Sequence, residues 1–80
     1  MKKLLYIVSL MFVIQAAFAQ SFDRGNELYR KGDYAGAAQQ YEGVLKQKQE
    51  SSELYFNLGN AYYKLNNVAP SIYNYEKALL

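Results

Sequence analysis

An internal repeat is the feature that most constrains how this chain can fold. When the sequence is aligned with itself at an offset of 34 residues, seven of the twenty-two pairs from Gly25/Gly59 to Lys46/Leu80 are identical. In the first copy the identical residues are Gly25, Asn26, Tyr29, Ala35, Tyr41, Glu42 and Leu45. A fixed period of this length is typical of stacked architectures, in which each copy is one supersecondary unit. The chain is therefore expected to contain two copies of one small unit.

Each copy is predicted to be a hairpin of two antiparallel helices, which gives an all-α fold. In the first copy a helix over residues 22–31 ends at Gly32, and Asp33 is placed to cap a second helix over residues 34–47. In the second copy a serine at position 51 or 52 caps a helix that ends before the Asn66-Asn67 turn. Asn67 is expected to cap a last helix, with Pro70 in its first turn, where the missing N–H breaks no helical hydrogen bond.

The first nineteen residues have the properties of a secretory signal peptide. A basic start at residues 1–3 is followed by an apolar run over residues 4–18, and Ala17-Phe18-Ala19 supplies small residues for cleavage after Ala19. The alternative is an uncleaved membrane anchor. A spanning helix needs about 20 apolar residues, whereas this run is shorter and is interrupted by Gln15. Cleavage is therefore predicted, and the protein is expected in the periplasm or cell envelope.

The predicted organisation is a signal peptide over residues 1–19, a first repeat over 20–50 and a second repeat over 51–80. Without Lys2 and Lys3 the nine basic residues become seven, which equal the seven acidic residues. A neutral chain lacks the positive surface that nucleic-acid binders use, so no nucleic-acid partner is expected.

Composition also argues against catalysis. The chain has no His and no Cys, so it cannot form a Ser/His/Asp arrangement, a thiolate nucleophile or a Cys-ligated zinc site. Its seven carboxylates are scattered among Lys and Arg, as on solvated helix faces. We expect no enzyme activity, no catalytic residue, no metal site, no cofactor and no small-molecule substrate.

The second copy resembles a known repeat family. The run Leu58-Gly59-Asn60-Ala61-Tyr62-Tyr63-Lys64-Leu65, followed by Tyr75-Glu76-Lys77-Ala78-Leu79, is similar to the tetratricopeptide repeat (TPR). The resemblance implies a TPR-type α-solenoid in which the glycine allows close approach of the second helix. Large and small residues then fill the seam, here Tyr55, Leu58, Gly59, Tyr62, Ser71, Tyr75 and Ala78.

The first copy matches the family pattern more loosely. Ser21 and Arg24 stand where large apolar residues are expected. A terminal repeat has no preceding hairpin to pack against, and a polar outer face there favours solubility.

The family resemblance also implies a binding surface. In TPR proteins the inner faces of the first helices line a concave groove, which here corresponds to Phe22, Asn26, Tyr29, Arg30, Phe56, Asn57, Asn60, Tyr63 and Lys64. Asn amides can hold a peptide backbone, and aromatic rings offer flat apolar contact. The basic side chains Arg30 and Lys64 favour an acidic ligand group, although a merely solvated face explains these two residues equally well.

Some family members clamp a C-terminal carboxylate with Lys and Asn side chains of successive repeats. Asn26 and Asn57 match two of those places. Phe22 stands where the first Lys is expected, and no third repeat supplies the remaining basic pair. That ligand specificity is therefore in doubt for this chain.

A narrower resemblance is to the TPR proteins of the Bacteroidetes aerotolerance operon, and it comes from the run over residues 56–65 and the run over residues 69–80, together with a leader ending at Ala19-Gln20. It implies a cell-envelope scaffold that binds a peptide or protein partner beside membrane-bound proteins. The alternative function is a docking arm of a larger membrane-associated complex or enzyme whose chemistry lies elsewhere.

The last helix is expected to leave an apolar face uncovered. Ala78-Leu79-Leu80 is apolar and uncapped, and stacked repeats generally need a polar element to cover the final face. This pattern predicts that the segment is the N-terminal part of a longer protein, or that it self-associates through residues 68–80.

Overall fold

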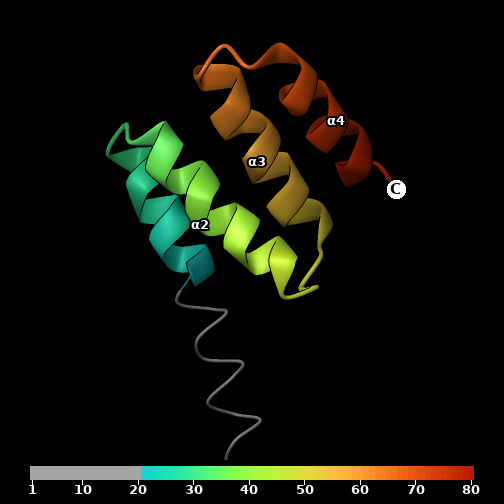
Figure 1. The fold of residues 1–80 in the computed structure, drawn as a ribbon, viewed down its shortest axis with the longest axis horizontal. Helices are drawn as coiled ribbons and strands as arrows, with labels where there is room; N and C mark the ends of the chain where they lie inside the picture. The colour runs from blue at the N-terminus through green and yellow to red at the C-terminus, as the bar shows by residue number, and fades with distance from the viewer. Residues whose placement is uncertain (1–20) are drawn as a thin grey trace, which may run out of the picture.

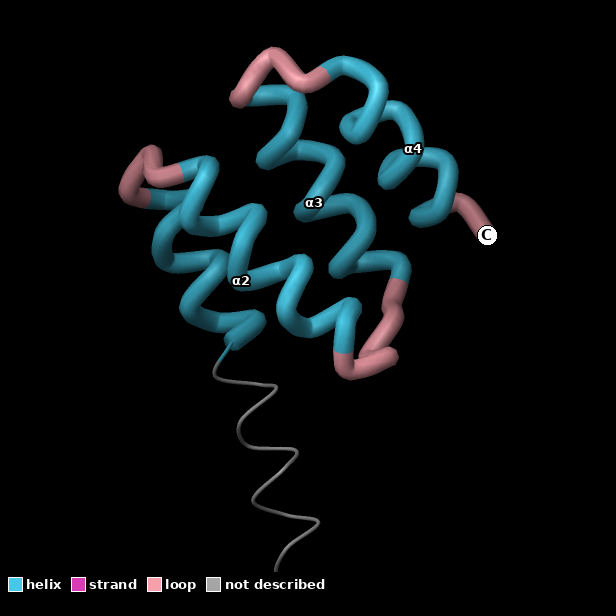
Figure 2. Tube along the Cα trace, in the orientation of Figure 1, coloured by secondary structure: helices cyan, strands magenta, loops and turns pink. Residues whose placement is uncertain are grey.

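The computed structural model describes residues 21–80 and shows an all-helical fold of two hairpins (Figure 1). Residues 21–30 are helical, and α2 (Tyr34–Lys46), α3 (Ser52–Lys64) and α4 (Val68–Ala78) follow. Short turns connect them (Figure 2). The predicted signal peptide at residues 1–19 lies outside the described residues. The predicted fold class of two stacked helix hairpins is confirmed.

The helix boundaries follow from local chemistry at the turns. The Asp33 carboxylate accepts a hydrogen bond of 2.9 Å from the Gly36 backbone N–H, and Ser51 Oγ accepts one of 3.1 Å from the Leu54 N–H. These side chains satisfy backbone donors that have no partner inside the helix. Gly32 ends the first helix with φ +86°, a conformation that favours glycine.

The predicted cap at Asn67 was only half right. Asn67 occupies the N-cap position of α4, but its side chain makes no capping hydrogen bond. The turn is formed instead by Asn66, whose φ of 61° lies in the left-handed region that asparagine tolerates. Backbone bonds from the N–H groups of Asn66 and Asn67 to the carbonyls of Tyr63 and Tyr62 close the end of α3.

The hydrophobic core lies between α2 and α3. Seven buried side chains form it, namely Ala37, Ala38, Tyr41, Val44, Leu54, Leu58 and Ala61. The first four come from α2 and the last three from α3. Because these residues recur every three or four positions, they form one apolar stripe on each helix, and the two stripes meet. The core therefore joins the second helix of one hairpin to the first helix of the next.

Each hairpin is closed by the same tyrosine-on-glycine contact. A Cβ placed on Gly25 would lie 2.5 Å from the Tyr41 ring, and one on Gly59 would lie 2.5 Å from the Tyr75 ring. A side chain at either glycine would therefore push the ring away. The prediction that Gly59 permits close approach of the second helix is confirmed, and the group that approaches is a tyrosine ring.

None of the helices within residues 21–80 is long and apolar enough to cross a membrane.

Candidate protein-binding cleft

A cleft of about 130 Å³ lies where the two hairpins meet. It is lined by Asn26, Tyr29, Arg30, Tyr41, Asn57 and Asn60. The described helix at residues 21–30 supplies three of these side chains, α2 supplies Tyr41, and α3 supplies the two remaining asparagines. Five of the nine side chains predicted for the groove therefore lie together around one cavity.

Asn26 connects the two hairpins at this cleft. Its Oδ1 accepts a hydrogen bond of 2.5 Å from the Tyr41 hydroxyl and one of 3.2 Å from the Asn57 side-chain amide. The Tyr75 hydroxyl donates a 2.5 Å hydrogen bond to Asn60 Oδ1 in the same way. Both asparagine oxygens are thus occupied. Within residues 21–80 the Nδ2 groups of Asn26 and Asn60 donate no hydrogen bond, so they are free to donate to a ligand.

The charge at the cleft is positive. Arg30 is exposed and is the single ionised side chain among the six lining residues described. Burial raises the pKa of Tyr41, and the Arg30 charge acts on that hydroxyl in the opposite direction, as expected of a cation facing it. Amide donors beside a guanidinium suit a backbone carbonyl next to an acidic group.

The other four predicted groove residues lie outside the cleft. The Phe22 ring centroid is 5.8 Å from that of Tyr41, and the Phe56 ring centroid is 5.9 Å from that of Tyr75. These phenylalanines therefore pack on the tyrosines that close each hairpin. Tyr63 and Lys64 are exposed near the end of α3. Neither lines the cleft, so the structure does not bring these four residues together with the other five.

The cleft residue that sequence reasoning missed is Tyr41. Its ring packs in the seam and is 1% exposed, as its repeat equivalent Tyr75 was predicted to pack. Its hydroxyl also reaches the cleft and fixes Asn26. The repeat contained a signal for this pairing, because Asn26 with Tyr41 and Asn60 with Tyr75 are both fifteen residues apart and are identical between copies.

A second, larger cleft of about 560 Å³ shares no residue with the first. Its lining includes Tyr55 and Tyr62 of α3, whose hydroxyls donate to Glu50 and Glu42 at 2.9 and 2.8 Å. Partial burial, together with the hydrogen bond to Glu42, raises the pKa of Tyr62 to about 12. Tyr62 thus joins α3 to α2 through its hydroxyl, and Tyr55 joins α3 to the loop that precedes it, so neither serves the seam by packing alone.

Comparison with known families assigns the fold. A family described as TPR repeat matches residues 25–66, which is more than half of the eighty residues. The chain belongs to the tetratricopeptide-repeat family. No curated protein matches the chain.

Family membership gives the class of function. TPR repeats are scaffolds for contacts with other proteins, so this chain is a protein-interaction module with protein partners. The matched family is a scaffold family and not a catalytic one.

Proposed function

We propose that the chain binds an extended segment of a partner protein in the cleft between its hairpins, next to an acidic group of that segment. The observation that carries this proposal is the composition of the cleft. Exposed Arg30 lies beside two asparagine amides whose oxygens are already held by tyrosine hydroxyls. The fixed oxygens orient the amide nitrogens before a ligand arrives, which lowers the entropy cost of binding.

The proposed setting is the cell envelope. The basic start, apolar run and Ala17-Phe18-Ala19 pattern support export with cleavage after Ala19. The similarity of residues 56–65 and 69–80 to TPR proteins of the Bacteroidetes aerotolerance operon supports a scaffold working beside membrane proteins of the envelope. In the alternative function the same cleft serves as a docking arm for a larger membrane-associated complex or enzyme.

Reversal of the Arg30 charge tests the proposed function. We expect Arg30→Glu to reduce capture of the partner from an envelope extract by about tenfold or more, because a hydrogen bond to a charged group contributes about 1.5–3 kcal/mol. The variant should keep its helicity, since Arg30 is exposed and forms no ion pair within residues 21–80. Quantitative pull-down with circular dichroism of the same samples measures both properties.

The matched control is Lys48→Glu, which makes the same charge change at an exposed turn outside the cleft. Equal loss of capture by both variants would indicate a general charge effect and would contradict binding in the cleft.

The bait is the protein recovered from the envelope fraction, and its intact mass reports the N-terminus. We expect Gln20 as the first residue, whereas an intact Met1 would favour the membrane-anchor alternative.

A further inference from the structure

The second cleft, of about 560 Å³, takes its lining from α2, the loop that follows it, α3 and α4. In Figure 1 α3 lies between α2 and α4, and it packs against both. We call the aromatic and polar side chains of this lining the tyrosine site: Glu42, Glu50, Tyr55, Tyr62, Tyr73 and Asn74. The tyrosine site shares no residue with the cleft that contains Arg30.

The two carboxylates of the tyrosine site have no positive partner among the described residues. Within residues 21–80 the ion pairs are those of Glu27 with Arg24 and Lys31, so neither Glu42 nor Glu50 takes part in one. No Lys or Arg of the described residues lines the cleft. Each carboxylate accepts one hydrogen bond from a tyrosine hydroxyl, at 2.8 and 2.9 Å, which leaves lone pairs for a ligand.

Both carboxylates act on the same tyrosine hydroxyl. Burial raises the pKa of Tyr55, and its hydrogen bond to Glu50 and the charges of Glu50 and Glu42 raise it further. The two negative charges therefore lie near one hydroxyl. Like charges that face one cleft give it a negative potential, which attracts a cation.

A buried amide oxygen adds a third acceptor. Asn74 is 4% exposed and lines the cleft. Its Nδ2 donates a hydrogen bond of 2.8 Å to the Pro70 carbonyl, so Oδ1 is the atom left without a partner within residues 21–80. Because no fully buried side-chain polar atom of those residues is unpaired, this oxygen is accessible from the cleft. Packing holds it in place before a ligand arrives, which lowers the entropy cost of binding.

The aromatic rings of the tyrosine site also suit a cation. Tyr73 is 57% exposed, and Lys77 Nζ lies 5.7 Å from its ring centroid, which is within the range of a cation–π contact. The ring therefore already attracts a positive group of this chain. The first hairpin has Ser21, Leu28 and Gln39 at the repeat positions of the three tyrosines, so a helix hairpin of this kind folds without aromatic rings there.

We propose that the tyrosine site binds the guanidinium group of an arginine side chain from a partner protein. A guanidinium carries several N–H donors in one plane, which meet the oxygens of Glu42, Glu50 and Asn74. Its flat face stacks on the tyrosine rings. The ammonium group of lysine is more strongly hydrated and has no flat face, so the site favours arginine. A protein supplies the arginine because the matched family is a scaffold for contacts with proteins.

The probe is the blocked tripeptide acetyl-Gly-Arg-Gly-amide, added to isotope-labelled protein recovered from the envelope fraction. We expect saturable NMR shifts of the backbone N–H signals of Tyr55, Tyr62 and Asn74. The same tripeptide with citrulline, which replaces the guanidinium by an uncharged group of nearly the same shape, should cause no saturable shift. The tripeptide with lysine should bind more weakly than that with arginine.

A matched pair of variants assigns the site. Glu42→Gln should weaken binding of the arginine peptide at least about fivefold, because it removes one charge that accepts from the ligand. Its amide oxygen can still accept the hydrogen bond of Tyr62, so the helices should persist, and the same NMR spectra check this. Glu76→Gln is the same change at the same repeat position, on an exposed part of α4 outside the cleft. It should leave the affinity unchanged.

Three results would overturn the proposal: no saturable shift with the arginine peptide, equal affinity of the citrulline or lysine peptide, or undiminished affinity in Glu42→Gln. The peptide comparisons use the unaltered protein, so they remain decisive even if the variant does not fold. Failure here is distinguishable from failure of the proposed function. The cleft at Arg30 takes an acidic group and is tested by Arg30→Glu, whereas the tyrosine site takes a basic group and shares no residue with that cleft.

Discussion

Tyr41→Ala is expected to lower the free energy of unfolding by about 3–5 kcal/mol, a large part of the total for a domain of this size. The Tyr41 side chain is 1% exposed, packs on Gly25 and Phe22, and holds Asn26 through its hydroxyl. Truncation of a buried aromatic side chain to Ala costs about 3–5 kcal/mol. A domain of roughly sixty residues has a free energy of unfolding of only about 3–9 kcal/mol. Urea denaturation followed by circular dichroism measures the loss.

Tyr75→Ala is the matched control for Tyr41→Ala. It removes the same residue type from the same repeat position, where the residue is only half buried and lines an open hollow beside α4. We expect the free energy of unfolding to fall by about 1–3 kcal/mol, clearly less than for Tyr41. Equal losses at the two sites would mean that Tyr75 is as buried as Tyr41 in solution and would contradict the observed difference in burial.

Gly59→Leu is expected to destabilise the protein by about 1–3 kcal/mol. Its Cβ would lie 2.5 Å from the Tyr75 ring, and overpacking of this kind costs about that amount. The higher helix propensity of Leu opposes the loss by up to about 1 kcal/mol. A four-carbon side chain at such a close contact falls at the upper end of the overpacking range, so the net effect is destabilising. Thermal unfolding measures the shift.

Gly43→Leu makes the same change on α2, where a Cβ would meet nothing within 4 Å. There only the helix propensity acts, and we expect a gain of up to about 1 kcal/mol. The two glycine variants should therefore shift stability in opposite directions. A stabilising shift at both positions would show that the tyrosine-on-glycine contact at Gly59 does not close the second hairpin.

The helices were predictable from the sequence because their ends carry strong local signals. Asp33, Gly32 and Pro70 each restrict the backbone at one position, and the observed boundaries at residues 30, 34 and 46 differ from the predicted ones by no more than one residue. The cap at Asn67 was not predictable in the same way. Asparagine is a common N-cap residue, but the Asn67 side chain makes no capping hydrogen bond to α4, and the sequence does not determine which way that side chain turns.

The candidate site was predictable only as a helix face. The family resemblance placed Asn26, Arg30 and Asn57 on one helix face, and the cleft contains all three. A position on a helix face does not determine the direction in which its side chain points. The rings of Phe22 and Phe56 turn toward the closing tyrosines, and this choice depends on packing with another helix, which a single sequence does not display.

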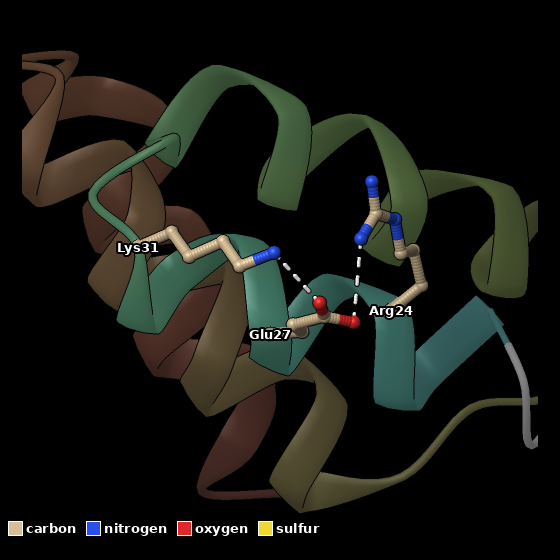
Figure 3. A network of polar contacts seen from close by, with 3 residues as sticks. All are labelled: Arg24, Glu27 and Lys31. Carbon is tan, nitrogen blue, oxygen red and sulfur yellow. Dashed lines mark hydrogen bonds and ion pairs between the residues drawn. The ribbon is translucent and has the colours of Figure 1, made fainter.

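Arg24 on the first helix stands where the family pattern has an apolar residue, and this difference indicated the polarity of that helix face. Arg24 breaks the apolar pattern of the repeat, which predicted a polar outer face at a terminal repeat. The structure shows Arg24 and Lys31 both paired to Glu27 on that helix (Figure 3). These paired charges form a polar outer face on that helix, as Arg24 predicted.

Site-specific photo-crosslinking in living cells tests the central claim most directly, namely that a partner protein binds in the cleft between the hairpins. A photoreactive phenylalanine derivative is placed at position 29, where Tyr29 lines the cleft, or at position 39, which is exposed on α2 and does not line it. We predict a light-dependent adduct with a partner polypeptide from position 29 and none from position 39. Adducts of equal yield from both positions, or from position 39 alone, would contradict binding in the cleft.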